Sequence, residues 1–172
     1  YARAPQIQLQ VIDLNRLVRE VLDLYRGHGH AKIQAELDAS APRVEADAGR
    51  LRQLLHNLIK NAQEAVAADS ATARAAHMGV ATRVVGNADE QPYVELSVTD
   101  NGPGFSTEML DKLFEPYVTT KLKGTGLGLA IVKKIVEEHG GIIQADNLPE
   151  GGGAVVRIRL RLAEPGVHAM GI

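Results

Sequence analysis

The feature that most constrains the fold of this chain is a strict two-residue alternation near its C-terminal end. Aliphatic residues alternate there with arginines, in the run Val156, Arg157, Ile158, Arg159, Leu160, Arg161 and Leu162. Successive side chains of a β-strand point to opposite faces of a sheet, so this run predicts a strand with one apolar and one cationic face. We expect the apolar face to pack against helices and the arginine face to stay in solvent.

The rest of the sequence divides into helical and strand-like segments. Helical spacing of apolar residues predicts helices over 13–25, 47–66 and 127–139, and a short helix is expected over 106–113. Alternating patterns predict strands over 33–37, 79–85, 93–99, 142–146 and 154–162. Strands joined by hairpins, with helices between them, predict an α+β fold: a two-layer sandwich in which a mixed, mainly antiparallel sheet is covered by helices on one face.

Composition narrows the class of protein. The 172 residues are 45% hydrophobic and 23% charged, which is typical of a globular domain with its own core. A net charge of −2 and only 3% aromatic residues argue against nucleic-acid binding. The absence of cysteine excludes disulfides, thiolate nucleophiles and cysteine-based zinc sites. The apolar runs are far too short for a membrane helix, so we expect no membrane contact by this fragment.

Two asparagines lie one helical turn apart in the segment 47–66. Asn57 and Asn61 both fall on one edge of its apolar stripe. Asparagine is a weak helix former, and two amides at the rim of a buried face could bind a hard cation such as Mg²⁺ through oxygen. A pair of capping or solvent-exposed amides explains the same spacing, so the residues alone leave both interpretations open.

A glycine-rich turn follows the strand expected over 93–99. It reads Asp100-Asn101-Gly102-Pro103-Gly104. Glycines let the backbone approach a ligand closely, and an ionised carboxylate only accepts hydrogen bonds, so Asp100 could receive an exocyclic amine. A plain tight turn is the alternative, because these residue types also favour turns.

A second glycine-rich run, Gly124-Thr125-Gly126-Leu127-Gly128, opens the helix expected from residue 127. Free N–H groups and the positive end of the helix dipole form a phosphate site there, and Lys121 and Lys123 add positive charge just upstream. A dinucleotide-dependent oxidoreductase would need a strand directly before these glycines, whereas a segment rich in lysine and threonine precedes them. The Walker pattern of P-loop proteins is absent, so neither of these nucleotide-binding classes is expected.

In this order, the motifs resemble the ATP-binding domain of sensor histidine kinases, in the gyrase–Hsp90–histidine kinase–MutL superfamily. The matching strings are Asn57-Leu58-Ile59-Lys60-Asn61-Ala62 (N box), Asp100 to Gly104 (G1 box), Phe114-Glu115-Pro116-Tyr117 (F box), Gly124 to Leu129 (G2 box) and Gly151-Gly152-Gly153 (final glycine box). Two further strings, Tyr117 to Lys121 and Ile131 to Val136, are similar to nitrogen-regulation kinases of the NtrY and NtrB type. The resemblance implies a Bergerat-type fold that binds ATP and Mg²⁺.

The resemblance also implies a role for each matching residue. Asn61 would ligate Mg²⁺, and Asp100 would accept the adenine amine in a base pocket shaped by Gly102 and Gly104. Phe114 would pack at the base of a mobile lid over about residues 115–125, from which Lys121 would contact phosphate. Backbone N–H groups for the phosphates would come from Gly124, Thr125, Gly126, Leu127 and Gly128. Asn57, which would also line the nucleotide site, and Lys121 are the two candidates for a part in catalysis.

Asn57 stands where the resemblance places a glutamate base in the ATP-hydrolysing relatives. Because a neutral amide cannot accept a proton from water, we expect slow hydrolysis and transfer of the γ-phosphoryl group to a protein histidine. The family's acceptor string His-Glu-x-x-Asn-Pro is absent, so the acceptor is expected on a separate dimerisation domain. None of the six histidines is assigned a catalytic role, and His56 is expected to be solvent-exposed.

The resemblance sets the expected organisation and partners. Residues 1–11 would be a linker remnant of the missing dimerisation domain, 12–162 the ATP-binding domain and 163–172 a flexible tail. The start at Tyr1 suggests an excised fragment, expected to be monomeric and cytoplasmic, with an inner-membrane anchor of the parent protein left open. The expected partners are the phosphoacceptor domain and a response regulator, in two-component signal transduction.

Two rival functions stay open. One is another ATPase or a serine kinase of the same superfamily, against which Asn57 and the F box weigh. The other is a degenerate kinase domain used only for docking, which the intact motifs disfavour. Mg²⁺-dependent ATP binding, and then transfer to an added acceptor domain, would separate the three.

Overall fold

The computed structural model describes residues 6–26, 32–68, 76–86, 89, 91–115 and 128–163, and it confirms the α+β class. In this part of the chain, five strands form one sheet in the order β2-β4-β5-β7-β6. They are β2 (Lys32–Glu36), β4 (His77–Val85), β5 (Tyr93–Asp100), β6 (Ile142–Asn147) and β7 (Ala154–Arg161). β2 pairs with β4 in parallel and the other neighbours are antiparallel, so the sheet is mixed and mainly antiparallel, as predicted.

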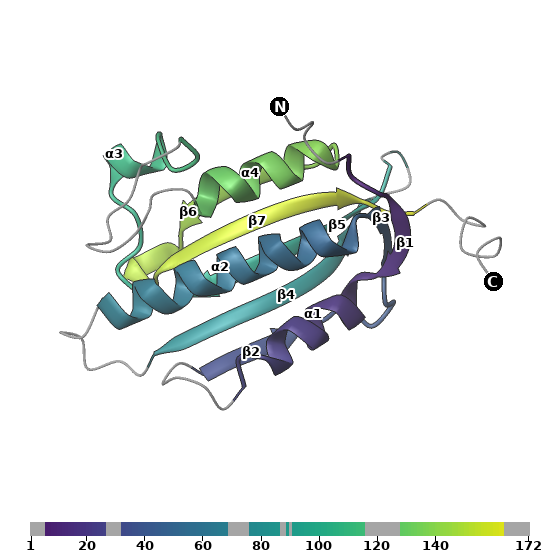
Figure 1. Cartoon of the computed structure of the whole chain (residues 1–172). Coiled ribbons are helices and arrows are strands. Elements are labelled where there is room, and N and C mark those ends of the chain that lie inside the picture. The colour runs from purple at the N-terminus through teal and green to yellow at the C-terminus, as the bar shows by residue number, and fades with distance from the viewer. Residues whose placement is uncertain are drawn as a thin grey trace.

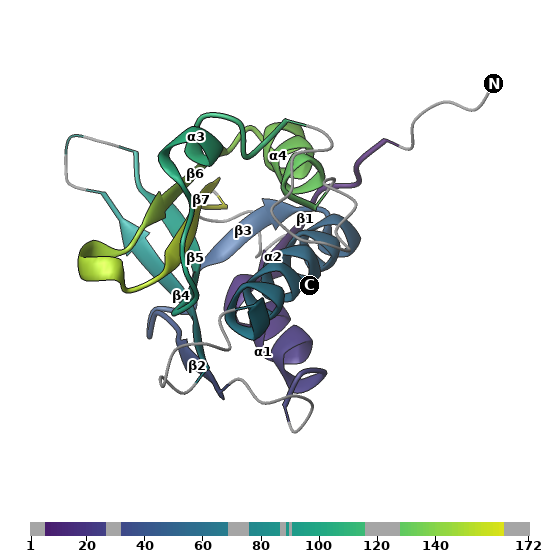
Figure 2. The ribbon, with the colours of Figure 1, turned by 90° about the vertical axis from the view of Figure 1, so that its left-hand side faces the viewer.

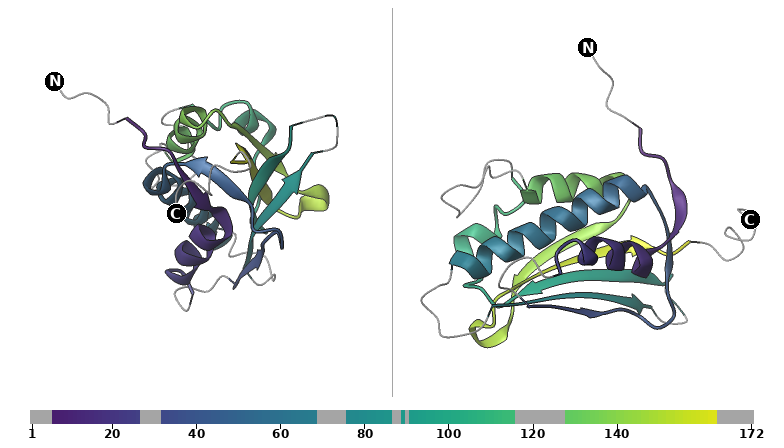
Figure 3. Two further views of the ribbon diagram at one scale, coloured as in Figure 1. Left: turned by 90° about the vertical axis from the view of Figure 1, so that its right-hand side faces the viewer. Right: turned by 60° about the horizontal axis from the view of Figure 1, so that its bottom comes forward.

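Three helices cover one face of this sheet (Figures 1 and 2). They are α1 (Leu14–Asp23), α2 (Ala48–Ala68) and α4 (Gly128–Glu138), while the short helix α3 (Thr107–Leu110) lies beyond the start of α4. Figure 3 shows α2 between α1 and α4. No helix in the described ranges combines the length and the apolar composition needed to cross a membrane.

The core lies between the helical layer and the sheet. On α2, the leucines that recur with helical spacing are all buried, at 2% exposure or less: Leu51, Leu54, Leu55 and Leu58. They meet inward-facing strand residues such as Leu96 and Ile158. The predicted apolar face of β7 is therefore confirmed, because its alternating aliphatic residues are buried in the core. Among its outward arginines, Arg159 lies over the ring of Tyr93, 4.8 Å from the centroid.

A second, two-stranded sheet lies outside the sequence prediction. β1 (Gln10–Asp13) pairs antiparallel with β3 (Arg43–Ala46), and a bridge from Val44 to Leu162 connects β3 to the end of β7. Strand structure therefore begins at Gln10, within the range 1–11 that the resemblance implies to be a linker remnant. Both strands are four residues long, which is too short for an alternating pattern to stand out. Residues 164–172, most of the expected tail, lie outside the described residues.

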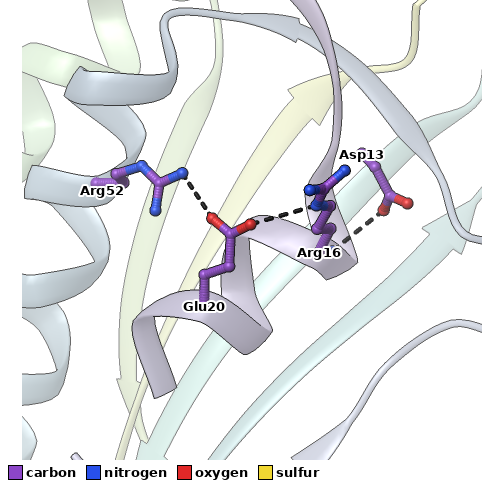
Figure 4. A network of polar contacts seen from close by, with 4 residues as sticks. All are labelled: Asp13, Arg16, Glu20 and Arg52. Carbon is purple, nitrogen blue, oxygen red and sulfur yellow. Dashed lines mark hydrogen bonds and ion pairs between the residues drawn. The ribbon is translucent and has the colours of Figure 1, made fainter. Parts of the chain in front are cut away.

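Polar contacts fix α1 against its neighbours (Figure 4). Asp13 caps the helix, as its carboxylate accepts the N–H of Arg16 at 3.2 Å. Glu20 of α1 joins this helix to α2 by its contact with Arg52 at 2.7 Å, and it contacts Arg16 within α1 at 3.2 Å. The hydrogen bond from Arg52 is the main cause that lowers the pKa of the Glu20 carboxyl. Because these ion pairs are largely exposed, each contributes little to the free energy of unfolding.

His56 is not simply solvent-exposed, contrary to the prediction from its place on α2. Its Nδ1 lies 2.7 Å from the hydroxyl of Tyr25, and the two rings are 5.5 Å apart. Tyr25 follows α1 and packs on the edge of the core, which brings it over the α2 surface that a helical wheel alone leaves open. Partial burial raises the pKa of the Tyr25 phenol.

A buried polar network ties α1 to the sheet. Asn15 is 1% exposed; its Nδ2 donates to the carbonyl of Asp38 at 2.8 Å, and its Oδ1 accepts from the Thr82 hydroxyl at 2.7 Å. The same hydroxyl accepts the N–H of Asp38 at 2.9 Å. Because each of these buried groups has a partner, the network fixes the crossing of α1 over β4 without leaving an unpaired polar atom among them.

Candidate functional site

The two asparagines lie on α2 as predicted, and both are half-buried. Asn57 and Asn61 are one turn apart in the middle of this helix. Asn61 lies directly against α4, because a Cβ atom built on Gly128 would be 3.2 Å from both Oδ1 and Nδ2 of Asn61. Glycine at the first position of α4 therefore lets the start of this helix come up against the amide.

The second predicted motif lies at the end of β5. Asp100 is the last residue of this strand, and its Oδ1 accepts the N–H of Gly102 at 2.9 Å. Gly102 packs on α2, since a Cβ atom on it would be 2.9 Å from the carbonyl oxygen of Ala65. Ala65 is one turn beyond Asn61, so neighbouring turns of α2 contact the β5 loop and the start of α4.

Three segments that are distant in the sequence thus meet at one end of the molecule. These are the C-terminal half of α2, the loop after β5 and the first residue of α4, all on the left in Figure 1. The segments that carry Asn61, Asp100 and Gly128 therefore lie side by side in the described residues, while the roles of these three residues stay predictions. The other residues of the glycine run, Gly124, Thr125, Gly126 and Leu127, lie outside them, as do Lys121 and most of the expected lid.

Asp100 is electrostatically unusual. At 9% exposure, it is the one acidic residue that is buried within the described ranges. Burial raises the pKa of its carboxyl, while the backbone N–H groups of Gly102 and Ala154 act in the opposite direction. A buried carboxylate is costly unless a donor satisfies it, and such perturbed groups are concentrated at functional sites.

Two glycines near the end of β5 have backbone conformations that other residues rarely adopt, and one of them packs against Asp100. Gly104 has φ +77°, and Gly153 has φ +112°, both in the left-handed region that favours glycine. A Cβ atom on Gly153 would overlap the carbonyl oxygen of Asp100 and lie 2.7 Å from its carbonyl carbon. Gly153, the last residue of the predicted final glycine box, therefore allows β7 to begin beside the end of β5.

Sequence reasoning missed two asparagines that hold this region. Asn101 accepts the N–H of His77 on its Oδ1 at 2.9 Å and so joins the loop to the start of β4. Asn147, at the end of β6, bonds both backbone groups of Phe105 at 2.7 Å each. Asn101 lies in the predicted glycine-rich turn but was given no role of its own, and asparagine is common in turns. Asn147 lies between Asp146 and Leu148, where the sequence contains no signal of its long-range contact.

Phe114, the residue of the predicted F box, is half-buried in the turn that follows α3, next to the buried Leu113. The described residues stop one position later, at Glu115, and resume at Gly128. Within the described ranges, no group of three or more histidine or acidic side chains is placed to hold a metal ion.

A shallow hollow of about 220 Å³ lies elsewhere, on the sheet face that the helices leave uncovered. Its walls include Gly79, Ala81 and Ser97, whose small side chains create the depression, with Gln34 and Glu36 at its side. None of the converging residues lines it. We therefore take the α2–β5–α4 end, and not this hollow, as the candidate site.

The chemistry of the α2–β5–α4 end suits a ligand with three different parts. The N-terminus of α4 presents free N–H groups and a positive dipole end, which favour phosphate. The amide of Asn61 beside it can supply an oxygen to a hard cation. The buried Asp100 carboxylate, at the end of β5, can accept a hydrogen bond from an amine.

Comparison with known proteins identifies a family and related kinases. Residues 46–164 match the model of the family described as histidine kinase-, DNA gyrase B- and HSP90-like ATPases. The nitrogen regulation protein NtrY of Azorhizobium caulinodans is 39% identical over 166 residues, which is 96% of this chain and 21% of NtrY. The chain thus spans about a fifth of the length of that relative.

Solved structures of kinases are similar as well. The catalytic domain of histidine kinase ThkA, in a nucleotide-free form, has a TM-score of 0.76 and 33% identity over 90% of this chain and 96% of its own. Full-length ShkA in complex with AMPPNP has a TM-score of 0.77 and 30% identity over 94% of this chain and 33% of its own. ThkA has also been solved with the response regulator protein TrrA, with a TM-score of 0.70, 32% identity, and coverage of 91% of this chain and 42% of that one.

Proposed function

The chain belongs to the family of histidine kinase-, DNA gyrase B- and HSP90-like ATPases, and on this premise we propose that it binds Mg-ATP as the catalytic domain of a sensor histidine kinase. The γ-phosphoryl group would pass to a histidine on a separate dimerisation domain. The observation that carries the proposal is the contact of α2 with both other segments, through Asn61 to Gly128 and through Ala65 to Gly102.

The described residues fit such a ligand. Asp100 is a buried acceptor whose cost is offset when it receives the exocyclic amine of adenine. Asn61 of α2 lies against the start of α4, so its amide oxygen and the N–H groups of that helix would be close to the metal and the phosphates together. Gly102 and Gly104 keep the backbone close to the base. ATP supplies the phosphoryl group, and the chain contributes binding, orientation and charge compensation.

The residues outside the described ranges keep their proposed roles. Gly124, Thr125, Gly126 and Leu127 would donate N–H groups to the phosphates, and Lys121 would reach a phosphate from the lid. Their place in the sequence supports this proposal, because they directly precede Gly128, which lies against Asn61. Phe114 would pack at the base of the same lid.

The partners follow from the proposed reaction. A phosphoacceptor domain of the parent protein would receive the phosphoryl group, and a response regulator would take it next. The complex of ThkA with TrrA supports this partner class by similarity. The domain would work on the cytoplasmic side, as part of a two-component system, and the isolated chain would be a monomer.

Titration calorimetry with ATP tests the proposal. We expect the 172-residue chain to bind ATP with Mg²⁺ and to bind it more weakly without the metal. Asp100→Ala should weaken ATP binding at least tenfold, because it removes a charge-assisted hydrogen bond worth about 1.5–3 kcal/mol. Asp23→Ala, which removes an exposed carboxylate from α1, is the matched control and should bind ATP normally. Equal ATP affinity of the Asp100 variant and the unsubstituted chain would remove the proposed adenine contact.

The position of Asn57 separates a kinase from a hydrolysing ATPase. An amide there cannot act as a general base, so ATP turnover without an acceptor should be slow. Asn57→Glu should raise release of inorganic phosphate, while transfer to an added phosphoacceptor domain should require the intact site. Fast hydrolysis by the unsubstituted chain, with no labelling of the acceptor, would favour an ATPase. Mg-ATP binding without either reaction would favour a docking module.

A further inference from the structure

Asn147 makes an unusual contact with the loop that follows β5. Its Oδ1 accepts the N–H of Phe105 at 2.7 Å, and its Nδ2 donates to the carbonyl of the same residue at 2.7 Å. One carboxamide thus pairs with both backbone groups of Phe105, as a neighbouring strand would. Asn147 is the last residue of β6, at the edge of the sheet, and 42 positions separate it from Phe105.

This contact fixes the far side of the loop that contains Gly102 and Gly104. On the near side, Gly102 packs against the carbonyl of Ala65 on α2. At Gly104 a Cβ atom would lie 2.7 Å from Oδ1 of Asn147 and 3.3 Å from the carbonyl oxygen of Gly153. The loop is therefore held between α2 on one side and the β6–β7 hairpin on the other.

We propose that Asn147 is a positioning residue for the base of the bound nucleotide. It would not touch the ligand; it would act through Phe105 and Gly104, which follow Asp100 in the same loop. This inference rests on the proposed function, in which Asp100 accepts the adenine amine. The described hydrogen bonds predict that the loop keeps its shape only while the carboxamide of Asn147 is present.

The pairing needs both a donor and an acceptor on one side chain. An aspartate has the same shape but lacks the donor, and its charge would face the carbonyl oxygen of Phe105. An alanine lacks both groups and leaves the Phe105 amide to water. Asn147→Asp and Asn147→Ala therefore remove one and two of the hydrogen bonds, respectively. Gln144→Ala, at an exposed position of the same strand that faces the uncovered side of the sheet, is the matched control.

The test combines two measurements on the 172-residue chain. Hydrogen exchange at the Phe105 amide, without nucleotide, reports on the loop alone; we expect it to be at least tenfold faster in Asn147→Ala than in the Gln144→Ala control. Titration with Mg-ATP and with Mg-GTP reports on the base. Because guanine lacks the amine at the position that Asp100 would read, loss of base positioning should weaken ATP about tenfold and GTP far less.

A lower ratio of ATP to GTP affinity in both Asn147 variants, at a melting temperature within a few degrees of the control, would support the role. An unchanged ratio would overturn it, and so would an equal loss for both nucleotides that follows a lower melting temperature. Failure of the unsubstituted chain to bind ATP would overturn the proposed function and this role together. Unchanged exchange at Phe105 in a chain that does bind ATP would overturn the role of Asn147 alone.

Discussion

Two glycines of the segment before β7 allow a sharp test of how Asp100 is held. Gly151 and Gly153 both have positive φ, at +69° and +112°. A Cβ atom on Gly151 would meet nothing within 4 Å, whereas one on Gly153 would overlap the carbonyl oxygen of Asp100. Alanine at 151 therefore measures the cost of the backbone conformation alone. Alanine at 153 adds a collision with the strand that ends in the proposed adenine contact.

The expected magnitudes follow from these contacts. Gly151→Ala should lower the free energy of unfolding by about 1–2 kcal/mol, the usual cost of a left-handed conformation. In Gly153→Ala the new methyl group would start 2.7 Å from the carbonyl carbon of Asp100, well inside the roughly 3.5 Å at which carbon atoms pack. The two strands must separate by roughly an ångström, so strain and overpacking together should cost about 3 kcal/mol or more.

Urea unfolding, followed by circular dichroism, measures the loss in unfolding free energy of each variant. Titration calorimetry at a low urea concentration measures the ATP affinity of each. A domain of this size commonly has about 5–15 kcal/mol of stability, which leaves most Gly153→Ala molecules folded for the titration. We expect Gly151→Ala to bind ATP normally and Gly153→Ala to bind it at least tenfold more weakly. Equal stability losses in the two variants, or normal ATP binding by Gly153→Ala, would refute the argument that this close approach positions Asp100.

Two further predictions concern buried polar groups. Because burial raises the pKa of the Asp100 carboxyl above its unfolded value, the stability linked to it is greatest at low pH and is lost as pH rises through the folded pKa. Asp100→Asn should therefore match the unsubstituted chain below about pH 4 and be more stable at pH 7, although it binds ATP poorly; a stability difference that shrinks with rising pH would contradict this. Thr82→Val should cost about 2–4 kcal/mol in urea unfolding, because it leaves Asn15 Oδ1 and the Asp38 N–H unpaired. Thr99→Val, on the uncovered face, is its control, and similar losses in the two would argue against the network.

The fold could be predicted where a local pattern was long enough to read. The alternation in β7 and the leucine spacing in α2 gave the two layers, and both are confirmed. The sheet order could not be read in the same way. The parallel pairing of β2 with β4 joins segments on either side of α2, and strand periodicity contains no information about such partners. Ala35 of β2 is a second case in which periodicity does not reveal the neighbours of a strand. Its place in the alternation predicts a core residue, but it is exposed because β2 lies at the edge of the sheet.

Sequence reasoning proposed the residues with ligand-binding chemistry, whose roles stay predictions, but not the residues that hold them in place. Asn61, Asp100 and Gly128 belong to strings whose residue types already suggest a ligand, and contacts of α2 with Gly128 and Gly102 bring these strings together. Asn147 and Asn101 act on backbone groups far away in the sequence, so their partners exist only in the folded chain. The role of Gly153 likewise depends on which strand lies beside it.

The position of β7 in the sheet has a consequence for how the chain folds as the ribosome produces it. This last of the described strands lies between β5 and β6, and its end bridges to β3 near the start of the chain. Until it emerges, β6 has no neighbour and β5 has an open edge whose hydrogen-bonding groups could pair with another nascent chain. We therefore expect the final native structure to form late, after translation has passed residue 161, with slow kinetics set by these long-range pairings.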